Sequence, residues 1–229
     1  MGLPVSFPGK AFRDRADAGR ALAERLRHYA GASDLLVLGL PRGGVPVAYE
    51  VATALSAPLD VFVVRKLGVP GRAELAMGAI ADGGVRIVNR SITEPLRLSD
   101  AVVEEVAAQE SVELVRRQQA YRAGRAALDV TDKVTIVVDD GLATGATMRA
   151  AVAALRAQVP RRIVAAVPVG ARSTCAELGA EVYEVVCVRS PIMFQAVGQW
   201  YEDFSPTTDE EIGAILARTQ PPSEAPGAG

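Results

Sequence analysis

The sequence predicts an α/β fold, with a parallel sheet flanked by helices in a single domain. Short apolar runs alternate with amphipathic stretches along most of the chain, which is the pattern of strands covered by crossover helices. The chain has 229 residues, of which 49% are hydrophobic and 23% charged, so it can bury one sizeable core. We expect this domain to span residues 1–218, followed by a disordered tail at 219–229 that is rich in Pro and Gly.

The first third of the chain is expected to form two helices and two strands. The first helix spans 14–29, where Leu22 and Leu26 share one face and Gly31 provides the stop. Apolar runs of strand length then stand on both sides of a second amphipathic stretch. These segments predict strands at 35–40 and 59–64 and a helix at 45–55.

The middle of the chain is less regular. Residues 65–91 are rich in glycine and contain only short extended pieces. We expect a long loop here, and loops of that length usually carry function. A long helix is predicted at 98–124, with Val102, Val103 and Val106 facing the core and several arginines near its C-terminal end, where cations favour the helix dipole.

The second half is expected to complete the sheet. Its strongest strand is the apolar run 134–138, followed by a loop of small residues and an Ala-rich helix to about residue 158. Further strands are predicted at 163–167 and 182–188, on either side of a short helix at 172–178. After Pro191 we expect a cap on the sheet, formed by the aromatic residues Phe194, Trp200, Tyr201 and Phe204.

Charge and cysteine content exclude several classes of protein. The 25 basic and 27 acidic residues give a net charge of −2, so nucleic acid is not an expected partner. No uncharged apolar run approaches the roughly 18 residues of a membrane span, so no membrane partner is expected. Cys175, Cys187 and the single histidine, His28, are too few for a disulfide framework or a zinc cluster. Free cysteines, read as small buried residues, favour a cytoplasmic location.

The segment 134–147 carries the strongest functional signal. A buried strand ends in two adjacent carboxylates, Asp139 and Asp140, and a loop of small residues then enters a helix. Backbone N–H groups at a helix N-terminus bind anions, and carboxylates accept hydrogen bonds from vicinal hydroxyls. We therefore expect a sugar phosphate here, the alternative being an ordinary turn with solvated acids. The anion would be held by Ala143, Thr144, Gly145, Ala146 and Thr147.

This segment, Val137 to Thr147, resembles the 5-phosphoribosyl-1-pyrophosphate (PRPP) motif of type I phosphoribosyltransferases. The resemblance implies that Asp139 and Asp140 hold the ribose 2- and 3-hydroxyls and that residues 143–147 bind the 5-phosphate. The pieces 64–68, 77–80 and 201–204 look like a bacterial group of predicted phosphoribosyltransferases whose acceptor is unknown.

Other segments match the family in the expected order. Residues 40–44 resemble its pyrophosphate loop, which implies binding roles for Arg42, Gly43 and Gly44 and a cis peptide bond between Pro41 and Arg42. Arg65 and Lys66 resemble the basic pair that meets the pyrophosphate. The alternative for residues 40–44 is a plain turn with a solvated arginine. The alternative for Arg65 and Lys66 is a pair of exposed basic residues at a strand end. Residues 68–89 would form a flexible closing loop, and about 190–218 a small hood.

The resemblance implies transfer of the 5-phosphoribosyl group of PRPP to a nitrogenous base, with release of pyrophosphate. Asp139, Asp140 and Lys66 would be catalytic, and Mg²⁺ would be the cofactor, held indirectly by the two aspartates through ribose hydroxyls or water. Family members that use 6-oxopurines carry an aspartate where this chain has Ala143. That departure disfavours hypoxanthine and guanine as acceptors.

A second hypothesis keeps the binding site without the reaction. In it the chain is a regulatory protein that binds PRPP and does not turn it over. The expected partners are PRPP and an unidentified base, and a homodimer is a possible assembly. The sequence leaves open the acceptor, the choice between turnover and sensing, and the role of Glu74 in the predicted loop.

Overall fold

The computed structural model describes residues 11–219 apart from 123–124 and 126–127, and all of their side chains except those of 73–74. Its centre is a parallel sheet with the strand order β2-β1-β6-β7-β8. The strands are nearly continuous apolar runs because both faces of the sheet are covered. They comprise β1 (Leu35–Gly39), β2 (Leu59–Val61), β6 (Val134–Val138), β7 (Arg162–Val169) and β8 (Glu184–Arg189).

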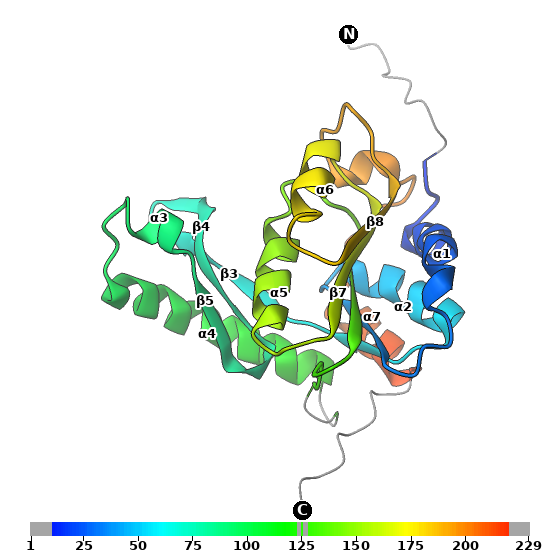
Figure 1. The fold of residues 1–229 in the computed structure, drawn as a ribbon, viewed down its shortest axis with the longest axis horizontal. Helices are drawn as coiled ribbons and strands as arrows, with labels where there is room; N and C mark the ends of the chain where they lie inside the picture. The colour runs from blue at the N-terminus through cyan, green and yellow to red at the C-terminus, as the bar shows by residue number, and fades with distance from the viewer. Residues whose placement is uncertain (1–10, 123–124, 126–127, 220–229) are drawn as a thin grey trace, which may run out of the picture.

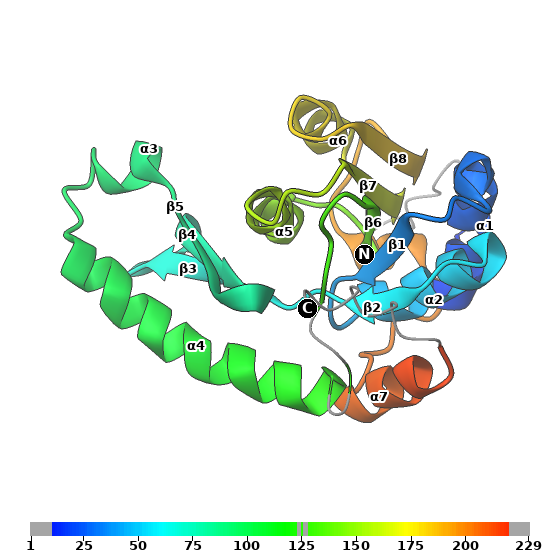
Figure 2. The same cartoon turned by 60° about the horizontal axis from the view of Figure 1, so that its bottom comes forward.

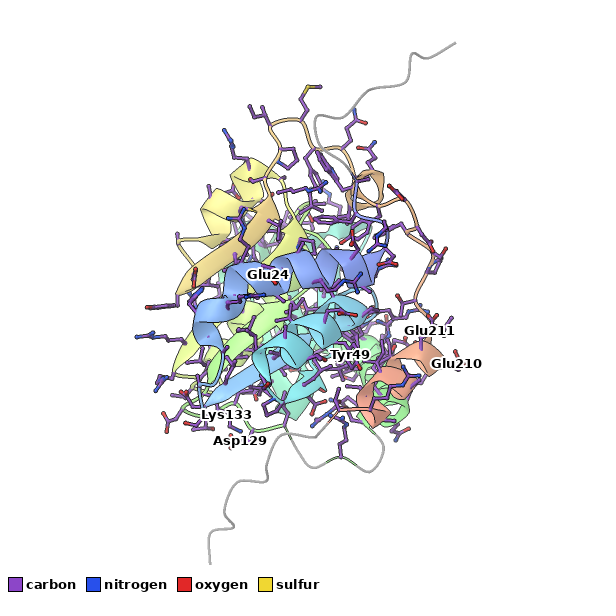
Figure 3. All side chains as sticks on the ribbon, turned by 90° about the vertical axis from the view of Figure 1, so that its right-hand side faces the viewer. Glu24, Tyr49, Asp129, Lys133, Glu210 and Glu211 are labelled. Atoms are coloured by element: carbon purple, nitrogen blue, oxygen red, sulfur yellow. The ribbon has the colours of Figure 1, made fainter. Side chains whose placement is uncertain are left out.

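Helices cover the sheet on both faces, as expected for an α/β fold (Figure 2). On one face lie α1 (Arg15–Leu26) and α2 (Gly44–Leu55), which pack side by side and leave Glu24 on the solvent side (Figure 3). On the other lie α5 (Ala146–Arg156) and α6 (Arg172–Leu178). The first helix begins where predicted, because the Asp14 side chain accepts a hydrogen bond from the Asp17 N–H and caps it.

A second unit projects from one side of the sheet in Figure 1, and we call it the arm (residues 64–122). It consists of an antiparallel sheet in the order β3-β4-β5 with a long helix packed along it. The short helix α3 (Arg90–Thr93) connects the two. The bounds are β3 (Val64–Val69), β4 (Arg72–Ala81), β5 (Val85–Val88) and α4 (Asp100–Arg122).

The arm corrects the prediction of a flexible loop over residues 68–89. Two of the glycines that suggested a loop, Gly68 and Gly78, lie inside strands, and the others stand in the turns between strands, where Gly71, Gly83 and Gly84 have φ values of 75°, 78° and 72°. A left-handed turn conformation of this kind favours glycine. A Pro-Gly pair between two extended stretches is a recognised turn signal, and it was present at Pro70 and Gly71.

The long helix α4 lies within the range predicted for it. Val103 is buried as expected, whereas Val102 and Val106 are only partly buried. Burial continues along the helix at Ala107, Leu114 and Tyr121. Although α4 is the longest helix described, no helix in the described part of the chain is long and apolar enough to cross a membrane.

The C-terminal segment divides into two parts. Trp200 and Tyr201 are buried against Phe12, which pairs with Tyr201 in an isolated bridge, so this part packs on the sheet as expected. Phe204 stays largely exposed. The helix α7 (Asp209–Ala217) packs instead against α2 and α4. Of the predicted tail, residues 220–229 lie outside the described residues.

Candidate active site

Two loops meet where the neighbouring parallel strands β1 and β6 end. The glycine loop (residues 41–44) follows β1, and the small-residue loop (residues 141–147) follows β6 and the acidic pair, Asp139 and Asp140. The Leu40 N–H donates to the Val138 carbonyl at 2.9 Å, which holds the two strand ends together. The carboxyl ends of adjacent parallel strands are the usual ligand site in such sheets. The Pro41–Arg42 peptide bond is cis, as the resemblance predicted.

The glycine loop touches the acidic pair directly. A Cβ atom built on Gly43 would overlap the Asp140 carboxylate. A Cβ on Gly44 would lie 2.8 Å from the Asp139 Cα, closer than real Cβ atoms come to other atoms. Both positions therefore require glycine, and the two predicted motifs form one continuous surface.

The acidic pair is in an unusual electrostatic environment. Both carboxylates are partly buried, and loss of solvation raises the pKa of Asp139 and of Asp140. The charge of Asp140 raises the pKa of Asp139 further, although Asp139 Oδ1 accepts a hydrogen bond from the Asp140 N–H at 2.9 Å. Such a pair is unfavourable when empty. It gains from any ligand that donates hydrogen bonds or brings positive charge.

Arg15 is the site residue that sequence reasoning missed. Its Nε donates to Asp140 Oδ2 at 2.9 Å, its Nη1 donates to the Ser205 carbonyl at 2.7 Å, and its guanidinium lies 4.1 Å from the centre of the Phe204 ring. The Tyr201 hydroxyl donates to the Asp140 carbonyl at 2.6 Å. Thus α1 and the C-terminal segment together fix Asp140. No local pattern connects residues 15 and 140, so only the fold reveals the pair.

The small-residue loop surrounds a small cavity of about 150 Å³ that Asp139 and Val197 also line. Gly145 has a φ of 73° and immediately precedes α5, so the first-turn N–H groups of that helix border the cavity. The Thr174 hydroxyl donates to the Ala143 carbonyl at 2.7 Å and holds the loop from outside. The N-terminus of α5 therefore borders the cavity, and the binding of an anion there stays a prediction.

The predicted basic residues lie apart from the acidic pair. Arg65 in β3 donates through Nε to Glu110 of α4 at 2.7 Å, and Arg42 Nε lies 3.8 Å from Asp209 of α7. Arg65 and Lys66 line a cavity of about 730 Å³ between the arm and α5. Pro41 and Thr147 line the same cavity, which connects the basic residues to both loops. The side chain of Glu74 lies outside the described residues.

Comparison with known proteins agrees with this arrangement. A family model described as "Phosphoribosyl transferase domain" matches residues 10–204. The chain is 48% identical over 209 residues to the "Putative phosphoribosyl transferase Rv0571c" of Mycobacterium tuberculosis strain H37Rv, and equally to its counterpart in strain CDC 1551. The match covers 91% of this chain and 47% of each relative, so the chain spans about half the length of these curated relatives.

A solved structure is similar over nearly the whole chain. This is TT1426 from Thermus thermophilus, with a TM-score of 0.82 and 43% sequence identity, over 90% of this chain and 97% of that one. The similarity extends over the whole fold, because most of both chains is aligned. Together with the matched family model, it shows that this chain belongs to the phosphoribosyltransferase family.

Proposed function

We propose that this domain transfers the 5-phosphoribosyl group of PRPP to a nitrogenous nucleophile and releases pyrophosphate. One observation carries the proposal most strongly: the glycine loop lies against the acidic pair at the ends of β1 and β6, next to the N-terminus of α5. In this proposal one sugar phosphate would bind across these three features, which offer N–H donors, carboxylate acceptors for hydroxyls and a second backbone loop. Taken alone, the glycine loop or the small-residue loop could be an ordinary turn without a ligand.

Each part of the site would have a distinct task in binding. The N–H groups of residues 143–147 would hold the 5-phosphate, and the acidic pair would accept hydrogen bonds from the ribose 2- and 3-hydroxyls. Arg15 would act as a positioning residue, because its hydrogen bond fixes the orientation of Asp140. The bare backbone of Gly43 and Gly44 would let the pyrophosphate approach closely.

The chemical step would depend mainly on charge. As the nucleophile attacks C1 and the bond to pyrophosphate breaks, positive charge develops on the ribose and negative charge on the leaving group. The acidic pair would stabilise the first, and Arg42, Arg65 and Lys66 the second. Since Arg42 and Arg65 face Asp209 and Glu110 here, they would have to exchange these partners for pyrophosphate oxygens.

The donor set of the site fits Mg²⁺. Asp139 and Asp140 would hold the ion indirectly, through ribose hydroxyls or water, and oxygen ligands are the ones Mg²⁺ prefers. Among the described residues no three His, Cys, Asp or Glu side chains gather into a metal site. When bound, the ion would neutralise pyrophosphate charge.

Pyrophosphate release tests the proposal. The chain is incubated with PRPP, Mg²⁺ and a panel of nitrogenous bases, and pyrophosphate is measured with and without each base. We expect pyrophosphate release that depends on one class of base. The Asp139→Asn, Asp140→Asn double variant should release none. Failure of every base, with PRPP binding retained, would favour the regulatory alternative, which the carboxylate partners of Arg42 and Arg65 also support. Failure of PRPP to bind would overturn both.

A further inference from the structure

The two cysteines, expected to be separate small buried residues, form a pair. Cys175 lies in α6 and Cys187 in β8, which are neighbours in Figures 1 and 2, and both side chains are partly exposed. Both sulfurs face Gly170, where a built Cβ would lie 2.7 Å from Cys175 Sγ and 3.5 Å from Cys187 Sγ. The two thiols are also joined by a hydrogen bond.

The two thiols differ in reactivity. Hydrogen bonds from Cys187 and Ser190 lower the pKa of Cys175 to about 7, which favours its thiolate form. The same hydrogen bond raises the pKa of Cys187, whose Sγ also lies 3.0 Å from the Arg189 carbonyl oxygen. A partly exposed thiol with a lowered pKa beside a second thiol is the arrangement of oxidation-sensitive cysteine pairs.

We propose that Cys175 and Cys187 are a modification site that a hydroperoxide oxidises to an intrachain disulfide. The Cys175 sulfur attacks the peroxide, so that an S–O bond forms, the O–O bond breaks and one molecule of water or alcohol leaves. Cys187 then attacks the Cys175 sulfur, an S–S bond forms, and the hydroxyl leaves with the Cys187 proton as water. Two thiols are oxidised by two electrons and one peroxide is reduced.

The pair is mechanically connected to the small-residue loop. The Leu142 N–H donates to Val169 and the Leu142 carbonyl accepts from the Ala171 N–H, each at 2.9 Å. Thr174, adjacent to Cys175, donates to the Ala143 carbonyl. A disulfide bond is shorter than a thiol–thiol hydrogen bond, so oxidation draws the first turn of α6 toward β8 and loosens the hydrogen bond from Thr174. This consequence rests on the proposed function, because it assumes that the loop binds phosphate.

The first experiment follows the thiols alone. The full chain is treated with hydrogen peroxide, alkylated and mapped by peptide mass. We expect the loss of both alkylatable thiols and a linked pair of peptides two hydrogens lighter. In Cys187→Ser, dimedone should trap a sulfenic acid at Cys175, whereas Cys175→Ser should give no adduct. Two free thiols after treatment, or links only between chains, would overturn the proposal.

The second experiment measures affinity for PRPP in the reduced and oxidised states. We expect about fivefold weaker binding after oxidation, the effect of one weakened hydrogen bond, with full recovery in dithiothreitol and no change in the Cys187→Ser control. Equal affinity in both states would overturn the connection to the loop. If PRPP binds in neither state, the proposed function and the connection both fail, and the linked peptides alone decide the thiol chemistry.

Discussion

The parallel sheet and the arm use charge in opposite ways. At the ends of the sheet strands, two carboxylates are held side by side and opposed mainly by Arg15. In the arm, bases of the antiparallel sheet pair with acids of α4, as in Arg65 with Glu110 and Arg86 with Glu104, both at 2.5 Å. Like charges that the fold forces together indicate a ligand site. Paired charges stabilise the arm, and any of them that serves a substrate must first give up its partner.

A buried polar seam joins the two regions. Asp60 of β2 is completely buried and accepts from Arg122, at the end of α4, at 3.0 Å. Close by, Asp82 at the base of the arm accepts from the Val63 N–H at 2.7 Å and from the Gln118 side chain at 2.5 Å. The seam therefore fixes how the arm stands relative to the sheet.

The largest effect should come from breaking the seam. Asp60→Asn removes one charge of a buried ion pair, so we expect the free energy of unfolding to fall by about 3 kcal/mol. Chemical denaturation measures it. The matched control is Glu24→Gln, which removes an exposed partner of Arg27 on α1 (Figure 3) and should change stability by less than about 0.5 kcal/mol. Equal denaturation midpoints for the two variants would contradict this view of the seam.

The next largest effect separates binding from stability at the acidic pair. Asp139→Asn keeps the shape of the side chain but removes a charge that the fold disfavours, so the melting temperature should stay level or rise. PRPP affinity should fall by about tenfold or more, because a hydrogen bond to a charged group is lost. Calorimetric titration and thermal unfolding on the same samples check both. Unchanged affinity, or a clear fall in melting temperature, would remove Asp139 from the ribose site.

The same contrast explains what the sequence could predict. The parallel strands were found because apolar runs such as 134–138 depend only on burial on both faces. The arm was missed because glycines interrupt its first two strands, at Gly68 and Gly78, and because its third strand, 85–88, is short and alternates between partly buried and exposed residues. The loops of the site were found through local motifs. Arg15 was not, because the contact between α1 and residue 140 exists only once the sheet is assembled.

A smaller effect tests the paired charges of the arm. Glu110→Gln releases Arg65 from its ion pair, so pyrophosphate should bind about two- to threefold more tightly, the typical strength of a partly exposed pair. Competition of pyrophosphate against PRPP measures it. Glu104→Gln, on the same helix α4, is the control, since it releases Arg86 of β5, which does not line the cavity that contains Arg65. If both variants behave alike, Arg65 has no specific role toward pyrophosphate.

The smallest effect concerns the pH dependence of the seam. Burial raises the pKa of Asp82, although its hydrogen bonds and the charge of Arg122 offset part of that cost. A raised pKa means that the folded state binds the proton more tightly than the unfolded one. The contribution of Asp82 to the free energy of unfolding is therefore fully present below its pKa in the unfolded chain. It is lost as pH rises through its pKa in the folded protein.

Asp82→Asn should remove this dependence. Its stability relative to the original chain should increase as pH rises above about 4, where Asp82 ionises in the unfolded chain, because the Gln118 amide can rotate to accept the new N–H. Asp203→Asn is the control of opposite sign, because hydrogen bonds from Ser205 lower the pKa of Asp203 and favour its charged form. Its relative stability should decrease as pH rises toward about 4, where Asp203 ionises, and stay level above that. The measurement is the denaturation midpoint of each variant at several pH values. If the midpoints of the two variants change with pH in parallel, burial does not control the pKa of Asp82.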